Sequence, residues 1–143
     1  MTNQHKIIIT RNFKTKRDIK HGLMNILSLK ANEGALFNMS TKNNHKFWMK
    51  NTFVPLDMIF MTKSNRVVGI VENAKPHDES IYHANVASNK IIEIKAGYVR
   101  KHDIRIGDRI DLIYKLRPKS HIRTRKCNKN KTNAMYTRKN KHL

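Results

Sequence analysis

Short apolar runs bounded by turn residues are the feature that most limits how this chain can fold. The runs are rich in Ile, Val, Phe and Met, and their length and composition are typical of β-strands. They cover residues 5–10, 34–39, 45–50, 56–62, 66–72, 90–95 and 109–116. Only residues 15–24 and 97–100 have a helical pattern. The sequence therefore predicts a mainly β domain of the α+β class, a small barrel-like or half-open sheet with two short helices.

Local signals mark the ends of several of these elements. Thr15 is a suitable N-cap for the first helix, and Gly22 interrupts that helix near its end. Turns are expected at residues 63–65 and 107–108. Residues 73–88 have no clear periodicity, so we expect a long loop there, and loops of that length are often functional.

A sharp change of composition divides the chain near Arg117 and Pro118. From residue 117 to residue 143 there are ten Lys and Arg residues and no acidic residue. Few side chains in this segment could fill a core, so we expect a disordered basic tail. The prediction is one β-rich domain over residues 1–116, followed by the tail over residues 117–143.

The chain carries a formal charge of +20. Such a charge attracts phosphate backbones, and nonspecific nucleic acid held by the tail of residues 117–143 is one candidate partner. The other explanation is compositional, since Lys, Asn and Ile are abundant, as in a chain with an AT-rich coding bias. Both explanations stay open for the tail and for the whole charge.

Few features of the chain indicate where in the cell it works. Cys127 is the only cysteine, so no disulfide can form within the chain, and a reducing compartment fits best. No apolar run is long enough to cross a bilayer, and none resembles the core of a signal peptide. We therefore expect no transmembrane segment and a cytoplasmic location.

The best candidate for a site lies in residues 47–57. Trp48, Lys50, Asn51, Thr52 and Asp57 lie there among mainly apolar neighbours, where charged side chains need partners. In one interpretation Lys50 and Asp57 satisfy each other, and the Asn51 amide pins the connection. In the other, Lys50 and Asn51 receive an anionic or carbonyl group, Trp48 provides a stacking wall and Asp57 orients Lys50.

Other polar residues are weaker candidates. Glu93 lies among isoleucines and could be a second carboxylate near Asp57, but we expect it to face solvent or to make a structural bond. His77 and His83 lie six residues apart in the long loop, a spacing that fixes no metal geometry. The sequence has no glycine-rich phosphate loop, nucleophile elbow or Cys-x-x-Cys pair. We therefore expect neither a metal nor a cofactor.

The order and spacing of several short motifs resemble the bacterial and archaeal family called domain of unknown function 192. These motifs are Gly-Leu-Met at 22–24, Gly-Ala-Leu-Phe at 34–37, Phe-Trp-Met-Lys-Asn-Thr at 47–52, Pro-Leu-Asp at 55–57, Val-Val-Gly-Ile at 67–70, Ala-Gly at 96–97 and Gly-Asp at 107–108. The resemblance covers about residues 6–114 and leaves the tail outside. It implies a compact β-rich domain with short helices, and it brings no reaction, substrate or cofactor.

Three classes of function follow from these observations. The first is a small binding or accessory domain for an unknown small ligand or protein partner, with Trp48, Lys50, Asn51, Thr52 and Asp57 lining its recognition surface. The second is a protein associated with nucleic acid through its basic residues. The third is a hydrolase that uses Asp57 and Glu93 as acid and base. Whether the protein is an enzyme is left open by the sequence.

Overall fold

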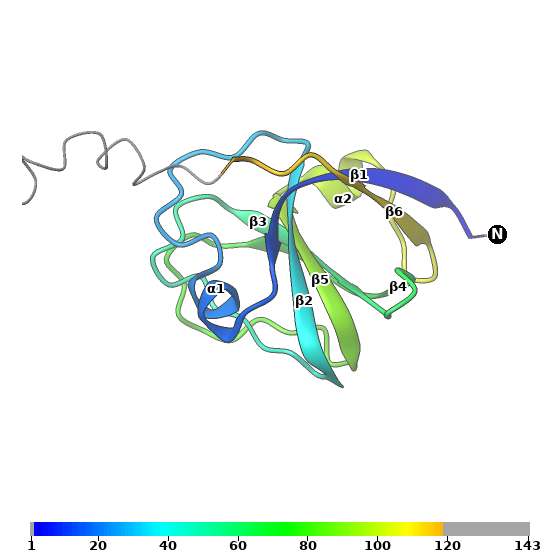
Figure 1. Cartoon of the computed structure of the whole chain (residues 1–143), viewed down its shortest axis with the longest axis horizontal. Coiled ribbons are helices and arrows are strands. Elements are labelled where there is room, and N and C mark those ends of the chain that lie inside the picture. The colour runs from blue at the N-terminus through cyan, green and yellow to red at the C-terminus, as the bar shows by residue number, and fades with distance from the viewer. Residues whose placement is uncertain (1, 119–143) are drawn as a thin grey trace, which may run out of the picture.

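The computed structural model describes residues 2–118 and contains six strands and two short helices (Figure 1). In chain order the elements are β1 (Gln4–Phe13), α1 (Lys16–His21), β2 (Glu33–Asn43), β3 (Leu56–Met61), β4 (Val67–Ala74), β5 (Ser88–Lys95), α2 (Tyr98–Lys101) and β6 (Arg109–Tyr114). Six of the seven predicted strands are therefore present. None of the helices within residues 2–118 is long and apolar enough to cross a membrane.

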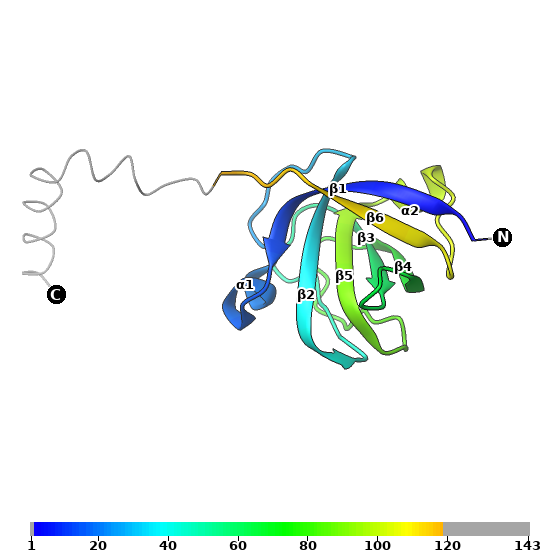
Figure 2. The ribbon, with the colours of Figure 1, turned by 45° about the vertical axis from the view of Figure 1, so that its right-hand side comes forward.

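All six strands belong to one sheet, in the order β4-β3-β5-β2-β1-β6. The pairs from β4 to β2 are antiparallel, whereas β1 lies parallel to both β2 and β6. The sheet curls until its two edge strands meet at one end (Figure 2). There the Val67 amide donates to the Asp108 carbonyl over 2.8 Å, and the Ile110 amide donates to the Asn65 carbonyl over 3.0 Å. The predicted half-open barrel is thus confirmed.

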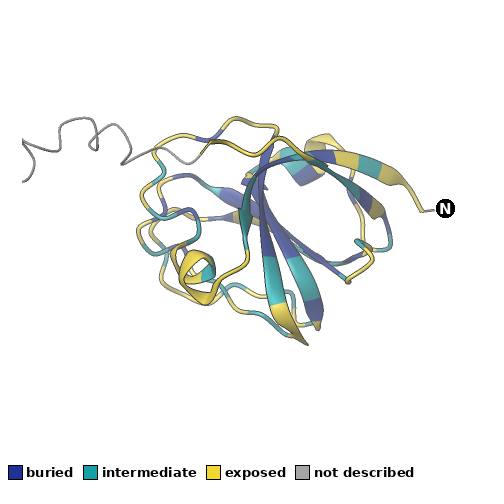
Figure 3. Ribbon diagram, viewed as in Figure 1, coloured by how far each residue is buried: buried dark blue, intermediate teal, exposed yellow. Residues whose placement is uncertain are grey.

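Both faces of the sheet are covered. The concave face forms one core with α2, and that core includes Ile9, Ile59 and Ile92. The convex face packs against α1 and the long connections, and its core includes Phe37, Met58 and Phe60. Every residue of β3 is buried, and the middle of β5 is buried as well (Figure 3). Polar side chains on either face of β3 and β5 are therefore removed from water.

The first helix is shorter than the predicted span of residues 15–24. Thr15 caps it as expected, since its Oγ1 accepts a hydrogen bond of 3.1 Å from the Asp18 amide. The helix ends at Gly22, whose φ of 52° departs from helical geometry. A side chain is strained at this φ, and a Cβ there would also lie 3.2 Å from the Phe37 ring. Residues after Gly22 therefore continue as a loop across the convex face.

The predicted strand at residues 45–50 is wrong. This segment makes only an isolated bridge, between Phe47 and Tyr82 of the loop between β4 and β5. The Met49 amide donates to the Asp78 carbonyl of the same loop over 2.7 Å. Its apolar side chains are explained by contact with the sheet, because Phe47 and Met49 pack on the convex face. The predicted long loop is present between Ala74 and Ser88.

Candidate functional site

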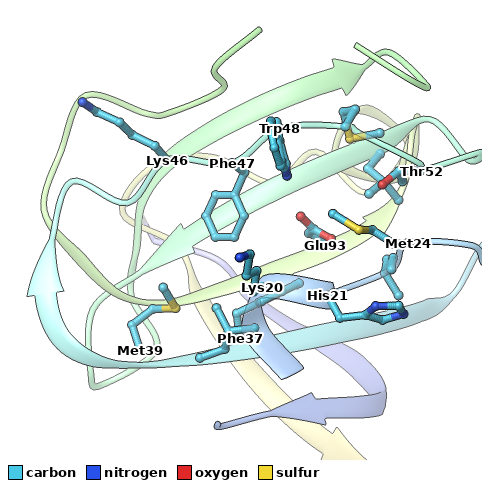
Figure 4. Close-up of a pocket in the computed structure, with 15 residues that line it drawn as sticks. Lys20, His21, Met24, Phe37, Met39, Lys46, Phe47, Trp48, Thr52 and Glu93 are labelled. Carbon is cyan, nitrogen blue, oxygen red and sulfur yellow. The ribbon is translucent and has the colours of Figure 1, made fainter. Parts of the chain in front are cut away.

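A pocket opens on the convex face of the sheet, between α1 and the segment that links β2 to β3 (Figure 4). Its volume is about 260 Å³. The residues that line it come from α1 and the loop after it, from the three strands beneath, and from the β2–β3 segment. They are Ile19, Lys20, His21, Gly22, Leu23, Met24, Phe37, Met39, Lys46, Phe47, Trp48, Met49, Thr52, Leu56 and Glu93.

Glu93 contributes the one acidic side chain of this lining. It lies in the middle of β5, directly opposite Ala35 of β2 and Met58 of β3, and is only 5% exposed. Within residues 2–118 no neighbouring group shifts its ionisation by a hydrogen bond or a charge, and burial alone raises the pKa of Glu93 to about 8. The expectation that Glu93 faces solvent is wrong, because the convex face of β5 is covered. At neutral pH the carboxyl group is mostly protonated.

Aromatic and thioether side chains form the walls of the pocket. Phe37 and Phe47 meet edge to face with ring centroids 5.4 Å apart. Phe47 also meets Phe60 of β3, at 6.1 Å. Trp48 lines the same pocket as Glu93 (Figure 4) and is 40% exposed. The walls are therefore largely apolar, with one side of the pocket formed by Trp48.

Lys50 lies outside the lining and supports Trp48. Its Nζ is 5.1 Å from the centroid of the Trp48 ring, a distance at which an ammonium group is attracted to the ring face. Asp57 is not its partner, so the predicted ion pair between Lys50 and Asp57 is wrong. The contact of the Lys50 side chain with the pocket therefore runs through the indole of Trp48.

Asn51 and Thr52 form the turn that ends this segment. Asn51 is exposed and has a positive φ of 52°, and its carbonyl accepts a 2.8 Å hydrogen bond from the Asn25 amide. Thr52 is buried in the pocket lining, and its hydroxyl donates to the Lys50 carbonyl over 3.1 Å. Asn51 therefore positions the backbone between α1 and the segment, whereas the Thr52 side chain reaches the pocket.

Asp57 has a structural role on the opposite face of the sheet. Its carboxylate is fully buried and accepts backbone hydrogen bonds from Asn73, Gly97 and Val99 at 2.9, 3.1 and 3.0 Å. These bonds tie β3 to β4 and to the start of α2. Asp57 pairs in register with Ile94, and Glu93 pairs with Met58, so the two acids project from opposite faces. The hypothesis of a hydrolase that uses Asp57 and Glu93 together is therefore wrong.

Of the six candidate residues from the sequence, Trp48, Thr52 and Glu93 line the pocket. Three exposed basic side chains of the lining were not predicted from the sequence: Lys20, His21 and Lys46. Lys20 and His21 are adjacent in α1, and their position opposite Trp48 depends on how that helix packs on the sheet (Figure 4). The sequence carries no local signal for that packing.

The two histidines of the long loop do not form a metal site. His77 is exposed and packs edge-on against Phe53, with ring centroids 4.6 Å apart. In residues 2–118 no three His, Cys, Asp or Glu side chains are grouped as metal ligands. The loop is held instead by Tyr82, whose hydroxyl donates to Asp78 over 2.6 Å and helps to lower the pKa of that carboxyl to about 2.

The fold and the pocket define a small, curled β-sheet domain with one buried acid beneath an aromatic opening. The family model DUF192, described as "Uncharacterized ACR", matches residues 2–112, and the chain belongs to this family. The resemblance drawn from its motifs is thereby confirmed. No curated protein sequence gives a significant match.

Two crystal structures share the fold. One is a protein of unknown function from Novosphingobium aromaticivorans DSM 12444, with 33% identity and a TM-score of 0.67, covering 70% of this chain and 71% of that one. The other, from Sinorhizobium meliloti 1021, is described as a "putative transcription regulator". It has 32% identity and a TM-score of 0.67, and the match covers 68% of this chain and 76% of that one. These relatives support the fold and establish no activity.

Proposed function

We propose that this domain binds a small organic molecule in the Glu93 pocket. The observation that carries the proposal is the buried Glu93 carboxyl group, which lines an open cavity of about 260 Å³ and whose pKa is raised by burial with no contribution from a hydrogen bond within residues 2–118. A polar group in such a position costs folding free energy unless something satisfies it. A ligand with a polar end would supply a hydrogen-bond partner inside the pocket.

The surroundings of Glu93 support binding more than they support hydrolysis. The Thr52 hydroxyl is engaged by the Lys50 carbonyl, and Asp57 lies on the other face of the sheet. The rest of the floor and walls is aliphatic, aromatic or thioether. An apolar pocket with one or two placed polar groups is the usual form of a ligand site. The recognition surface therefore consists of Trp48, Thr52 and Glu93, with Lys50 supporting Trp48.

The test is a fragment screen followed by amide chemical shifts in labelled protein. A ligand of this pocket shifts the amides of residues 19–24, 46–52 and 93, and it changes the fluorescence of Trp48, the only tryptophan. The Trp48→Ala variant should weaken the binding by about two- to tenfold, since an aromatic contact is worth about 0.5–1.5 kcal/mol.

Phe53→Ala is the matched control for Trp48→Ala. Phe53 is an aromatic of similar exposure, 44% against 40%, in the same segment, and it lies outside the pocket. Its removal should leave the affinity unchanged. Equal losses in both variants, or ligands that shift only amides remote from the pocket, would show that the pocket is not the site.

A second candidate function is nucleic-acid binding through the basic residues. It rests on the charge of +20 and agrees with the description given to the Sinorhizobium meliloti protein. Most of the basic tail lies outside the described residues. Arg117, at its start, is among the described residues, and its guanidinium pairs with Glu33 at 3.0 Å. This function and the single cysteine are both consistent with a cytoplasmic location, which we include in the proposal.

A further inference from the structure

The chemistry of the Glu93 pocket changes from its floor to its opening. The floor carries a single acid, Glu93. The walls carry the rings of Phe37, Phe47 and Trp48 and the sulfur atoms of three methionines, Met24, Met39 and Met49. The opening carries the basic side chain Lys20. His21 and Lys46 are also exposed residues of the lining, and the amino group of Lys46 points away from Glu93 (Figure 4). A ligand that matches all three zones has unlike groups at its two ends.

We infer that the ligand is a small zwitterion, with an organic ammonium group at Glu93 and an anionic group at the opening near Lys20. The inference rests on the proposed function and specifies the class of ligand. The body between the two charged ends is aromatic or alkyl, since it lies between Phe47, Phe37 and Trp48 (Figure 4).

An ammonium group fits the floor better than a neutral polar group. No hydrogen bond within the described residues contributes to the raised pKa of Glu93, and an ammonium group can donate to both oxygens of its carboxylate. The faces of aromatic rings attract cations, and thioether sulfurs are polarizable, so the walls favour the same charge. A carbonyl group of a ligand could only accept a hydrogen bond from the protonated Glu93 carboxyl group. The aromatic and thioether walls would not stabilise such a carbonyl any further.

The anionic end follows from the charges around the opening. Lys20 and His21 lie on α1, and Lys46 lies on the β2–β3 segment opposite that helix. The parts of β2 and β3 that line the pocket, Phe37, Met39 and Leu56, bring no ionisable group. A simple amine would therefore meet unbalanced positive charge as it entered. An anionic group on its outer end removes that repulsion.

Binding of such a ligand releases a proton. The protonated Glu93 carboxyl gives its proton to solvent and becomes the carboxylate that faces the ammonium group. With a pKa of about 8 in the free protein, about 0.9 proton should be released per ligand at pH 7. For the same reason the affinity should rise about 50-fold from pH 6 to pH 8. Comparison with Glu93→Gln isolates the part of this pH dependence that comes from Glu93.

The experiment compares three benzoates that differ only in the group opposite the carboxylate: 4-(aminomethyl)benzoate, 4-carbamoylbenzoate and 4-methylbenzoate. Calorimetry on the full chain, in two buffers of different ionisation enthalpy, gives affinity and proton release together. We expect the aminomethyl compound to bind at least tenfold more tightly than the other two and to release about 0.9 proton at pH 7. In Glu93→Gln the aminomethyl compound should bind no more tightly than the other two benzoates, and the proton release should disappear.

Each other result overturns part of the inference. If the carbamoyl or methyl compound binds as tightly as the aminomethyl compound, the ammonium end is wrong, although the pocket still binds ligands. If Lys20→Gln leaves the affinity for all three compounds unchanged, rather than lowering it about threefold, the anionic end is wrong. If none of the three compounds binds, the inference that the ligand is a zwitterion is wrong. The proposed function is then tested by the fragment screen alone.

Discussion

Replacing Glu93 by Gln should change how the stability of the protein depends on pH. The pKa of Glu93 is raised by burial from 4.5 to about 8, so the folded chain keeps a proton that the unfolded chain loses between these values. The contribution of this proton to the free energy of unfolding is therefore complete below pH 4.5, and it is lost as the pH rises to about 8. A glutamine side chain does not titrate, so the free energy of unfolding of Glu93→Gln should not fall over this pH range for the same reason.

The expected magnitude follows from the same two values. Each pKa unit corresponds to about 1.36 kcal/mol. Between pH 5 and pH 8 the free energy of unfolding of the natural chain should fall by about 3.5 kcal/mol relative to that of Glu93→Gln. Most of this difference appears before pH 7.5, since the loss levels off as the folded carboxyl begins to ionise. This is a large fraction of the stability of a small domain.

The assay is urea unfolding, followed by circular dichroism, at pH 5, 6, 7 and 8 and constant ionic strength. The eight histidines and the other acids are common to both proteins, so their effects cancel in the comparison. Glu72→Gln is the matched control, because Glu72 is exposed near the end of β4. The free energy of unfolding of Glu72→Gln should depend on pH in the same way as that of the natural chain. Parallel curves for Glu93→Gln and the natural chain would refute the argument that Glu93 is buried and uncharged.

Three further substitutions or deletions test other parts of the structure. Asp57→Asn should lower the free energy of unfolding by about 3 kcal/mol or more in urea titrations, because an amide replaces the carboxylate that accepts three backbone hydrogen bonds; an unchanged midpoint would contradict that role. Gly69→Ala should cost about 1–3 kcal/mol by the same assay, since its Cβ would lie 2.4 Å from that of Ala84; full stability would mean that the loop moves freely. Removal of residues 119–143 should abolish most of any salt-dependent binding to duplex DNA, and an equal salt slope in the shortened chain would exclude a role for the tail.

The strands and turns were predictable because their signals are local. Alternating apolar residues and their flanking turns gave β1, β2, β3, β4, β5 and β6 with small errors at the ends. Thr15 and Gly22 act on the helix between them through neighbouring backbone groups. Arg117, the first residue of the predicted tail, contacts the sheet, because its amide donates to the Thr10 carbonyl over 3.1 Å.

The site was only half predictable, because its residues depend on contacts between distant segments. The sequence showed that the acids in residues 56–62 and 90–95 needed partners or solvent, and it could not show which. Asp57 finds backbone amides forty and forty-two residues away, at Gly97 and Val99. The apolar segment at residues 45–50 resembled a strand because a segment that covers a sheet needs the same side chains as a strand within it.

Glu93 shows most clearly where the sequence stops and the tertiary structure decides. Alternation along residues 90–95 determined that Glu93 and Ile91 share one face and that Ile92 and Ile94 share the other. It did not determine whether the face of Glu93 is covered, since an antiparallel sheet can expose one side to water. Only the packing of α1 and of Phe47 and Met49 over that face removes the acid from solvent and leaves a cavity above it. Burial is a property of the surrounding chain, and no local pattern specifies it.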